Sequence, residues 1–337
     1  MLSKIILPLL LMILAYSLWI SPDFTQVAAG VAIFLFGVLS LKQGFQGFSG
    51  GALQRILRAC TNRLWKSLSF GLVATTLMQS SSLVSVLTIS FLSVGLIDLA
   101  SGIGVVFGAN LGTTASAWLI AGFGLKVKIA NFAMPMLVFG VFLIFQKSKL
   151  LSAMGSILVG MGFLFLGIHY MKEGFAVFRG SIDLAQYAIP GTKGLLIFML
   201  IGLVTTVIIQ SSDATMAIII TALSVQQISY ENSLALAIGA NIGTTITAII
   251  SSLGVNVEGK RLAAAHLIFN VITACIALLM LNQFVLAVDY LATLVHIAAD
   301  DYTLKLAMFH TLFNVTGILI LLPFIDRLVP KSCKHYT

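Results

Sequence analysis

Charged side chains are scarce in this sequence of 337 residues: Asp, Glu, Lys and Arg together make up only 9%. A soluble chain carries roughly 25% charged residues, so this chain cannot cover a globular surface in water. Hydrophobic residues reach 59%, and the mean hydropathy is +1.07. The scarcity of charge excludes a soluble enzyme, a secreted domain and a nucleic-acid-binding protein. The formal charge of +8 is therefore assigned to cytoplasmic loops beside the membrane lipid.

Cysteine is also rare, and short alternating apolar segments are missing. Cys60, Cys275 and Cys333 lie far apart without CxxC spacing, which signals neither a metal site nor a disulfide framework. A transmembrane β-barrel needs segments of about ten residues that alternate apolar and polar side chains, whereas the apolar runs here are long and continuous. The sequence therefore predicts an all-α polytopic membrane protein.

The long apolar runs predict the membrane spans. The first two, residues 5–20 and 27–41, are expected to form a helical hairpin of the mature protein, because no small-residue cleavage site follows the first run. Residues 42–66 hold five basic side chains and no acid, so they are placed in the cytoplasm, and their glycine-rich start argues against a membrane helix. Further spans are expected near residues 129–145, 150–170, 262–281, 284–298 and 304–322.

The sequence also contains an internal duplication. Sliding residues 71–117 onto 202–248 without a gap gives 19 identical positions out of 47. Internal duplication with interrupted helices is typical of secondary transporters, in which substrate lies at the repeat interface near the middle of the bilayer. Residues 42–66 carry a net charge of +5 and their counterparts at 172–193 carry +1, so the two segments are expected on opposite sides of the membrane.

The predicted architecture is therefore two inverted-topology repeats with interrupted or re-entrant helices. The expected units are residues 1–29 (an N-terminal transmembrane helix and turn), 30–160 (repeat 1), 161–300 (repeat 2) and 301–337 (a C-terminal transmembrane helix and a short basic tail).

Each repeat contains two polar segments inside apolar sequence. We call residues 79–82 and 210–213 the QSS segments, and residues 108–114 and 239–245 the GAN segments. Two glycines and an asparagine predict a helix break in each GAN segment, with free carbonyl groups that suit a hard cation such as Na⁺. The hydroxyl and amide groups of the QSS segments can bind a phosphate-like oxygen or a cation, and the N-terminus of a half-helix favours an anion. The alternative, hydroxyl groups that only hold helices together, fits lone serines better than these paired segments.

The QSS and GAN segments, present twice, resemble those of the sodium-dependent phosphate cotransporter family of type II. The resemblance covers roughly residues 30–325 and implies secondary active uptake of inorganic phosphate, driven by the sodium gradient through inverted repeats. A bacterial member without a PhoU-like C-terminal domain is expected. The resemblance assigns binding of phosphate and sodium to Gln79, Ser80, Ser81, Ser82, Asn110, Thr113, Thr114, Gln210, Ser211, Ser212, Asn241, Thr244 and Thr245.

Asp213 departs from the family pattern, in which serine is usual at this position. A carboxylate inside the bilayer needs a partner, and no lysine or arginine is near it along the chain, which leaves a sodium ion or a proton. Sodium is favoured because the neighbouring oxygen atoms suit a hard cation. Sodium is expected near Gln79, Ser80, Gln210, Ser211, Asp213, Thr244 and Thr245.

Other ionisable side chains are interpreted as structural. His266 and Asn270, like His310 and Asn314, share a His-x-x-Phe-Asn pattern, and interhelical hydrogen bonding is favoured for both over contact with a proton or substrate. Lys42 and Lys172 lie at the ends of expected spans and are interpreted as reaching toward the interface.

The predicted function is import of inorganic phosphate coupled to sodium ions by alternating access, in the bacterial inner membrane. Sodium is a co-substrate, membrane lipid surrounds the protein, a homodimer is left open, and neither a cofactor nor nucleic acid is expected. The alternatives are a sodium-coupled transporter of another small oxyanion or carboxylate and a passive anion channel. An intramembrane enzyme is set aside, because no HExxH pattern and no paired carboxylates lie within the spans.

Overall fold

The computed structural model describes residues 2–49, 63–125, 130–181 and 191–325, and the regular secondary structure in these ranges is entirely helical. Seven of the described helices are long and apolar enough to cross a membrane. The fold class predicted from the sequence, an all-α polytopic membrane protein, is confirmed. The helices are α1 (Leu2–Ile20), α2 (Pro22–Ser49), α4 (Leu64–Met78), α5 (Ser81–Ser93), α6 (Leu99–Gly112), α7 (Thr114–Trp118), α8 (Ala130–Ile144), α9 (Lys149–Ser181), α10 (Gly191–Ile209), α11 (Ser212–Ser224), α12 (Tyr230–Ser252), α13 (Val257–Leu279), α14 (Leu281–Leu294) and α15 (Tyr302–Leu321).

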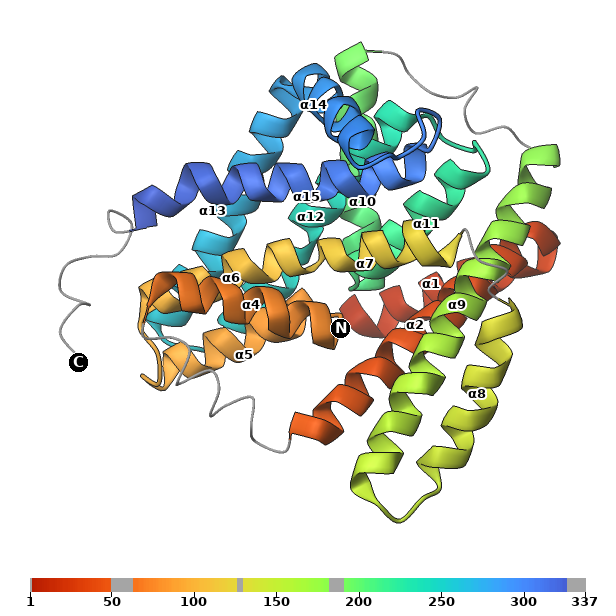
Figure 1. Ribbon diagram of the computed structural model, residues 1–337, viewed down its shortest axis with the longest axis horizontal. Coiled ribbons are helices and arrows are strands. Elements are labelled where there is room, and N and C mark those ends of the chain that lie inside the picture. Colours follow the sequence, from red (N-terminus) through yellow and green to blue (C-terminus); the bar gives the residue numbers. More distant parts are fainter. Residues whose placement is uncertain (1, 50–62, 126–129, 182–190, 326–337) are drawn as a thin grey trace.

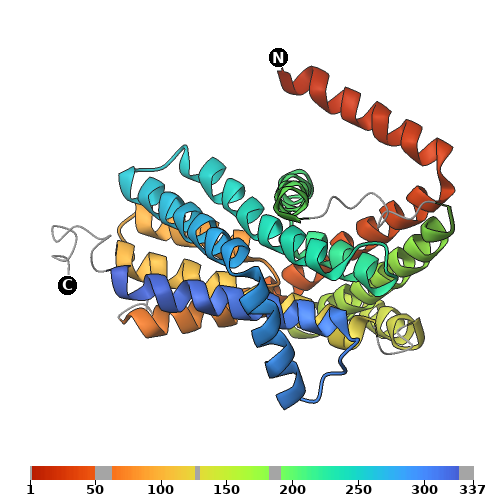
Figure 2. The same ribbon diagram turned by 90° about the horizontal axis from the view of Figure 1, so that it is seen from above.

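Helices α2 and α9 form an antiparallel pair beside the main bundle, and α8 packs against α9 (Figure 1). The positions of three glycines give the direction of the pair: Gly30 lies against Met171, Gly37 against Leu164 and Gly44 against Ile157. Helix α1 precedes this pair and stands away from the rest of the molecule (Figure 2).

Helix α2 is longer than the sequence predicted. The expected span ended at residue 41, because glycine lowers helix propensity, but the helix continues to Ser49. Gly44 and Gly47 lie against Ala153 of α9, so the missing side chains allow close packing that offsets their low propensity. Helix α9 likewise continues through Lys172 to Ser181, into the segment that was expected to be a linker.

Each repeat contains a pair of consecutive helices joined at a QSS segment, α4–α5 and α10–α11. The bounds of α5 and α11 differ by the same 131 residues that relate the two sequences. A helix of 13 residues is about 20 Å long, shorter than the hydrocarbon core of about 30 Å. The break in each hairpin falls at a QSS segment, so the prediction of interrupted helices is correct there.

The GAN segments, in contrast, do not break their helices. Helix α12 is continuous through residues 239–245, and in the first repeat only Thr113 separates α6 from α7, with φ −64° and ψ −23°. The expected free carbonyl groups are therefore not formed. The hydroxyl group of Thr244 donates to the Asn241 carbonyl, and that of Thr113 donates to the Asn110 carbonyl.

Close packing explains why glycines lie inside these helices. An added Cβ at Gly108 would lie 1.9 Å from the Leu68 carbonyl oxygen of α4, and one at Gly239 would lie 1.8 Å from the Met199 carbonyl oxygen of α10. Gly71 and Gly202 complete the same two contacts from the other side. The glycines that predict a break in the sequence are thus required for α6 to pack on α4 and for α12 to pack on α10.

Candidate functional site

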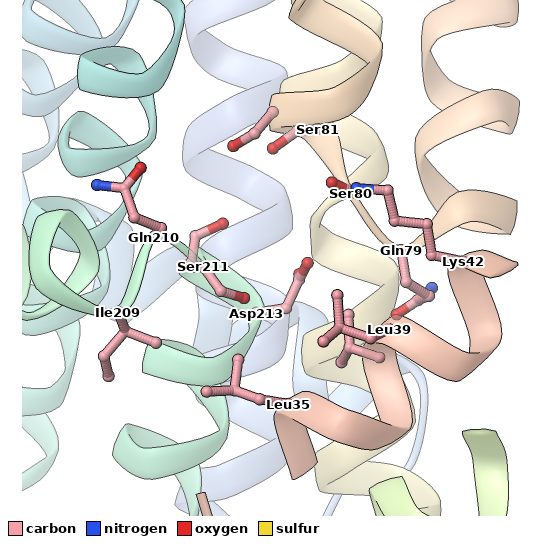
Figure 3. Close-up of a pocket in the computed structure, with 13 residues that line it drawn as sticks. Leu35, Leu39, Lys42, Gln79, Ser80, Ser81, Ile209, Gln210, Ser211 and Asp213 are labelled. Carbon is pink, nitrogen blue, oxygen red and sulfur yellow. The ribbon is translucent and has the colours of Figure 1, made fainter. Parts of the chain in front are cut away.

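The two QSS segments meet in one cavity of about 330 Å³ (Figure 3). All eight of their residues line it, together with apolar side chains from α2 and the end of α10. The full lining consists of Leu35, Val38, Leu39, Lys42, Gln79, Ser80, Ser81, Ser82, Ile209, Gln210, Ser211, Ser212 and Asp213. Segments 131 residues apart in the sequence therefore form opposite parts of one site.

The same local structure presents each QSS segment to the cavity. Gln79 and Gln210 end α4 and α10 in the left-handed conformation, with φ of 48° and 58°. The serine that follows each glutamine caps the next helix: Ser80 Oγ accepts from Leu83 N at 3.3 Å, and Ser211 Oγ accepts from Ala214 N at 3.2 Å. The first turns of α5 and α11 thus line the cavity, where the helix N-terminus carries partial positive charge.

Both glutamine side chains are fixed by hydrogen bonds at each end of the amide. Gln79 Nε2 donates to the Thr76 carbonyl at 2.6 Å, and its Oε1 accepts from Ser116 Oγ at 2.7 Å. In the second repeat, Gln210 donates to the Val207 carbonyl and accepts from Thr247 Oγ1 at 3.1 Å. The glutamines therefore connect the hairpin tips to the helices that follow them.

Ser116 and Thr247 were missed in the sequence analysis. The two positions are related by the same shift of 131, and the signal that could have identified them is a hydroxyl group at both equivalent positions. Either hydroxyl group alone gives no signal, because a hydroxyl group in an apolar helix usually bonds to its own backbone.

Asp213 lies in the first turn of α11 and is 5% exposed. Ser116, whose hydroxyl group donates to Gln79 of its own repeat, also lies near this carboxylate of the other repeat. No ion pair of Asp213 with a basic group is found within the described ranges. The location of this carboxylate at a helix N-terminus is favourable, since the helix dipole stabilises negative charge there.

The GAN residues predicted to join the site lie elsewhere. Asn110, Thr113, Thr114, Asn241, Thr244 and Thr245 are all buried, and none of them lines the cavity. Asn110 Oδ1 pairs with His266 Nε2 at 3.2 Å, and Asn241 Oδ1 pairs with His310 Nε2 at 3.4 Å. The two threonines of the second GAN segment, where sodium is expected, therefore do not line the QSS cavity.

The His-x-x-Phe-Asn pattern forms interhelical hydrogen bonds, as predicted. Besides its contact with His310, Asn241 donates through Nδ2 to Asn270 Oδ1 at 2.9 Å and to Asn314 Oδ1 at 3.1 Å. Three helices, α12, α13 and α15, are therefore joined at one buried amide. The GAN segments serve this packing network in the described structure.

One pattern typical of hydrolases does occur in the sequence, at residues 47–51, which read Gly-Phe-Ser-Gly-Gly. A G-x-S-x-G nucleophile requires a sharp turn between a strand and a helix. Ser49 is instead the last residue of α2, so the pattern does not have that structural context.

Comparison with known proteins gives one family. The sequence profile of the Na⁺/Pi-cotransporter family matches residues 33–173 and 187–318, and each matched part contains one QSS segment and one GAN segment. No solved structure shows a significant match to the chain.

Two curated relatives cover most of the chain. The uncharacterized protein YqeW of Bacillus subtilis is 26% identical over 296 residues, which is 87% of this chain and 92% of that protein. YjbB of Escherichia coli, named a putative inorganic phosphate export protein, is 25% identical over 319 residues, or 92% of this chain. The chain matches only 55% of the length of YjbB.

Proposed function

Since this chain belongs to the Na⁺/Pi-cotransporter family, we propose that it is a secondary active transporter that moves inorganic phosphate together with sodium ions across the bacterial inner membrane. The observation that carries the proposal is the single cavity lined by both QSS segments. A multi-pass membrane protein with a duplicated polar site fits the arrangement of transporters that alternate access around a central site.

The chemistry of the cavity supports a small anion accompanied by cations. The lining supplies the hydroxyl groups of Ser80, Ser81 and Ser82 from one repeat and of Ser211 and Ser212 from the other. Hydroxyl groups and helix N-termini bind phosphate oxygens, whereas the Asp213 carboxylate repels an anion unless a cation neutralises it. This dependence of anion binding on a cation is the physical basis of coupling.

The direction of transport distinguishes two forms of the proposal. Symport driven by an inward sodium gradient moves phosphate into the cell, and we propose this direction. Export is the second candidate, because the relative from Escherichia coli is named a phosphate export protein. Export would have to move phosphate out of the cell without using the inward sodium gradient as its driving force.

The test is transport of radiolabelled phosphate by the purified chain in proteoliposomes. Saturable uptake that requires an inward sodium gradient, and that arsenate but not sulfate inhibits, supports the proposal. Efflux from preloaded vesicles at the same rate with and without sodium would support the export form. Flux that rises linearly with phosphate concentration and ignores sodium would indicate a passive channel and contradict coupling.

Asp213→Asn is expected to weaken the apparent affinity for sodium about tenfold to a hundredfold, because removing a charged partner from a buried site costs about 1–3 kcal/mol. The measurement is the sodium dependence of phosphate uptake at saturating phosphate. Asp300→Asn, at an exposed position, is the control and should retain the wild-type value. An Asp213→Asn variant with unchanged sodium dependence but a flattened pH profile would assign a proton, not sodium, to this carboxylate.

The proposed inverted repeats can be tested by labelling equivalent positions of the two repeats and finding the side of the membrane from which each position reacts. Gly44 lies against Ile157, whereas its equivalent Gly174 lies against Val27, so the two occupy opposite ends of the α2–α9 pair. This arrangement supports inversion.

Gln46→Cys and Ala176→Cys, introduced singly after the three native cysteines are changed to serine, should therefore react with a membrane-impermeant maleimide from opposite sides. Reaction of both positions from the same side would contradict an inverted repeat and leave a parallel one.

A further inference from the structure

One basic side chain reaches the cavity from outside the QSS segments. Lys42 lies on α2, on the same helical face as Leu35, Val38 and Leu39, which form an apolar wall of the cavity. Figure 3 shows its side chain directed from α2 toward the QSS residues that line the cavity. Lys42, interpreted from the sequence as reaching toward the interface, lies seven residues before the end of α2 and lines the cavity.

The ammonium group of Lys42 has no acidic partner in the described part of the chain. The ion pairs found there join His169 to Glu173, Arg261 to Glu258 and Lys305 to Asp289. Asp213 lines the same cavity but does not pair with Lys42 within 4.0 Å. A half-buried cation beside an apolar wall is costly unless an anion accompanies it.

The second repeat does not reproduce this feature. Lys172 is the equivalent of Lys42, at a shift of 130, within the matching Lys-x-Gly-Phe sequence. It is exposed on α9 and is not part of the cavity lining. The two repeats therefore supply similar hydroxyl groups, but only the first supplies a positive charge, and only the second supplies a carboxylate.

We propose that Lys42 binds the transported anion directly, as a charged ligand to the phosphate oxygens in the cavity that the N-termini of α5 and α11 also line. This inference rests on the proposed function for the identity of the anion. Lys42 does not pair with Asp213, so the carboxylate still needs a sodium ion of its own. A bound phosphate meets Lys42 as a separate positive charge, which donates up to three hydrogen bonds.

The site also predicts which form of phosphate binds best. An ammonium group interacts more strongly with the dianion than with the monoanion, because the interaction energy scales with the product of the charges. Loss of the positive charge should therefore weaken binding of the dianion more than binding of the monoanion. A merely structural lysine would not change that preference.

The experiment compares Lys42→Gln, Lys42→Arg and the control Lys172→Gln in sodium-driven proteoliposomes, with phosphate uptake measured between pH 6 and 8. Lys42→Gln should raise the KM for phosphate about tenfold to a hundredfold and move the pH of lowest KM toward acid. Lys42→Arg, which keeps the charge, should stay within about fivefold of wild type. Lys172→Gln should match wild type, and all three variants should elute as monodisperse protein in detergent.

Each contrary outcome has one meaning. Wild-type protein that does not transport phosphate would overturn the proposed function itself. Wild-type transport together with a Lys42→Gln KM within twofold of wild type would overturn only the role of Lys42. The same role is overturned if Lys42→Arg is impaired as much as Lys42→Gln, since the size of the side chain rather than its charge would then govern the position.

Discussion

Gln79→Ala and Gln210→Ala should each reduce the proposed sodium-driven phosphate transport about tenfold to a hundredfold. Each glutamine connects a hairpin tip to a helix of its own repeat through Ser116 or Thr247, and alanine removes both of its amide hydrogen bonds. Each lost hydrogen bond costs about 0.5–1.5 kcal/mol, so the two together amount to roughly 1–3 kcal/mol, and the cap that follows the glutamine loses its support. The measurement is initial uptake rate per reconstituted protein.

A matched control separates the side chain from the backbone. Gln226 also has a left-handed conformation, with φ 59°, but it does not line the cavity. Gln226→Ala therefore places alanine in the same left-handed conformation at a position outside the site. This variant should transport normally. Near-normal transport by both Gln79→Ala and Gln210→Ala would show that the glutamines do not organise a transport site.

Gly239→Ala and Gly108→Ala should strongly destabilise the folded protein. An added Cβ would lie 1.8 Å and 1.9 Å from carbonyl oxygens of α10 and α4, and backbone atoms cannot move aside as a flexible side chain can. Overpacking of this kind costs about 1–3 kcal/mol or more. The expected result is a large fall in the Tm of the detergent-solubilised protein and in the yield of monodisperse protein.

The control for these variants is Gly254→Ala. An added Cβ at Gly254 meets nothing within 4 Å, so its Tm should equal that of wild type. If Gly239→Ala unfolded at the wild-type temperature, the close contact of α12 with α10 would not be a determinant of stability.

The sequence was sufficient to predict the class of fold and the pairing of the QSS segments. Composition and the length of the apolar runs predict membrane helices, because in a lipid bilayer the backbone polar groups must be hydrogen-bonded within the protein, and few structures other than helices achieve this. The QSS segments were found through duplication, and the structure brings residues 79–82 and 210–213 into one cavity.

The GAN segments show where such reasoning fails. Glycine was interpreted through its weak helix propensity, which is a local property. Its actual role depends on a second helix, because Gly108 and Gly239 contact residues about 40 positions earlier in the chain. The direction of Lys42 also depends on tertiary structure, since nothing in the local sequence shows that α2 borders the cavity.

The hydrogen bonds around Ser116 have a consequence for how the protein moves. The bonds Gln79–Ser116 and Gln210–Thr247 each stay within one repeat, whereas Ser116 of the first repeat lies near Asp213 of the second. If the two halves rock as rigid bodies, the two hydrogen bonds are preserved and the distance between Ser116 and Asp213 changes. A cation held at the Asp213 carboxylate would then have the Ser116 oxygen atom as a neighbour in one arrangement of the halves and not in the other.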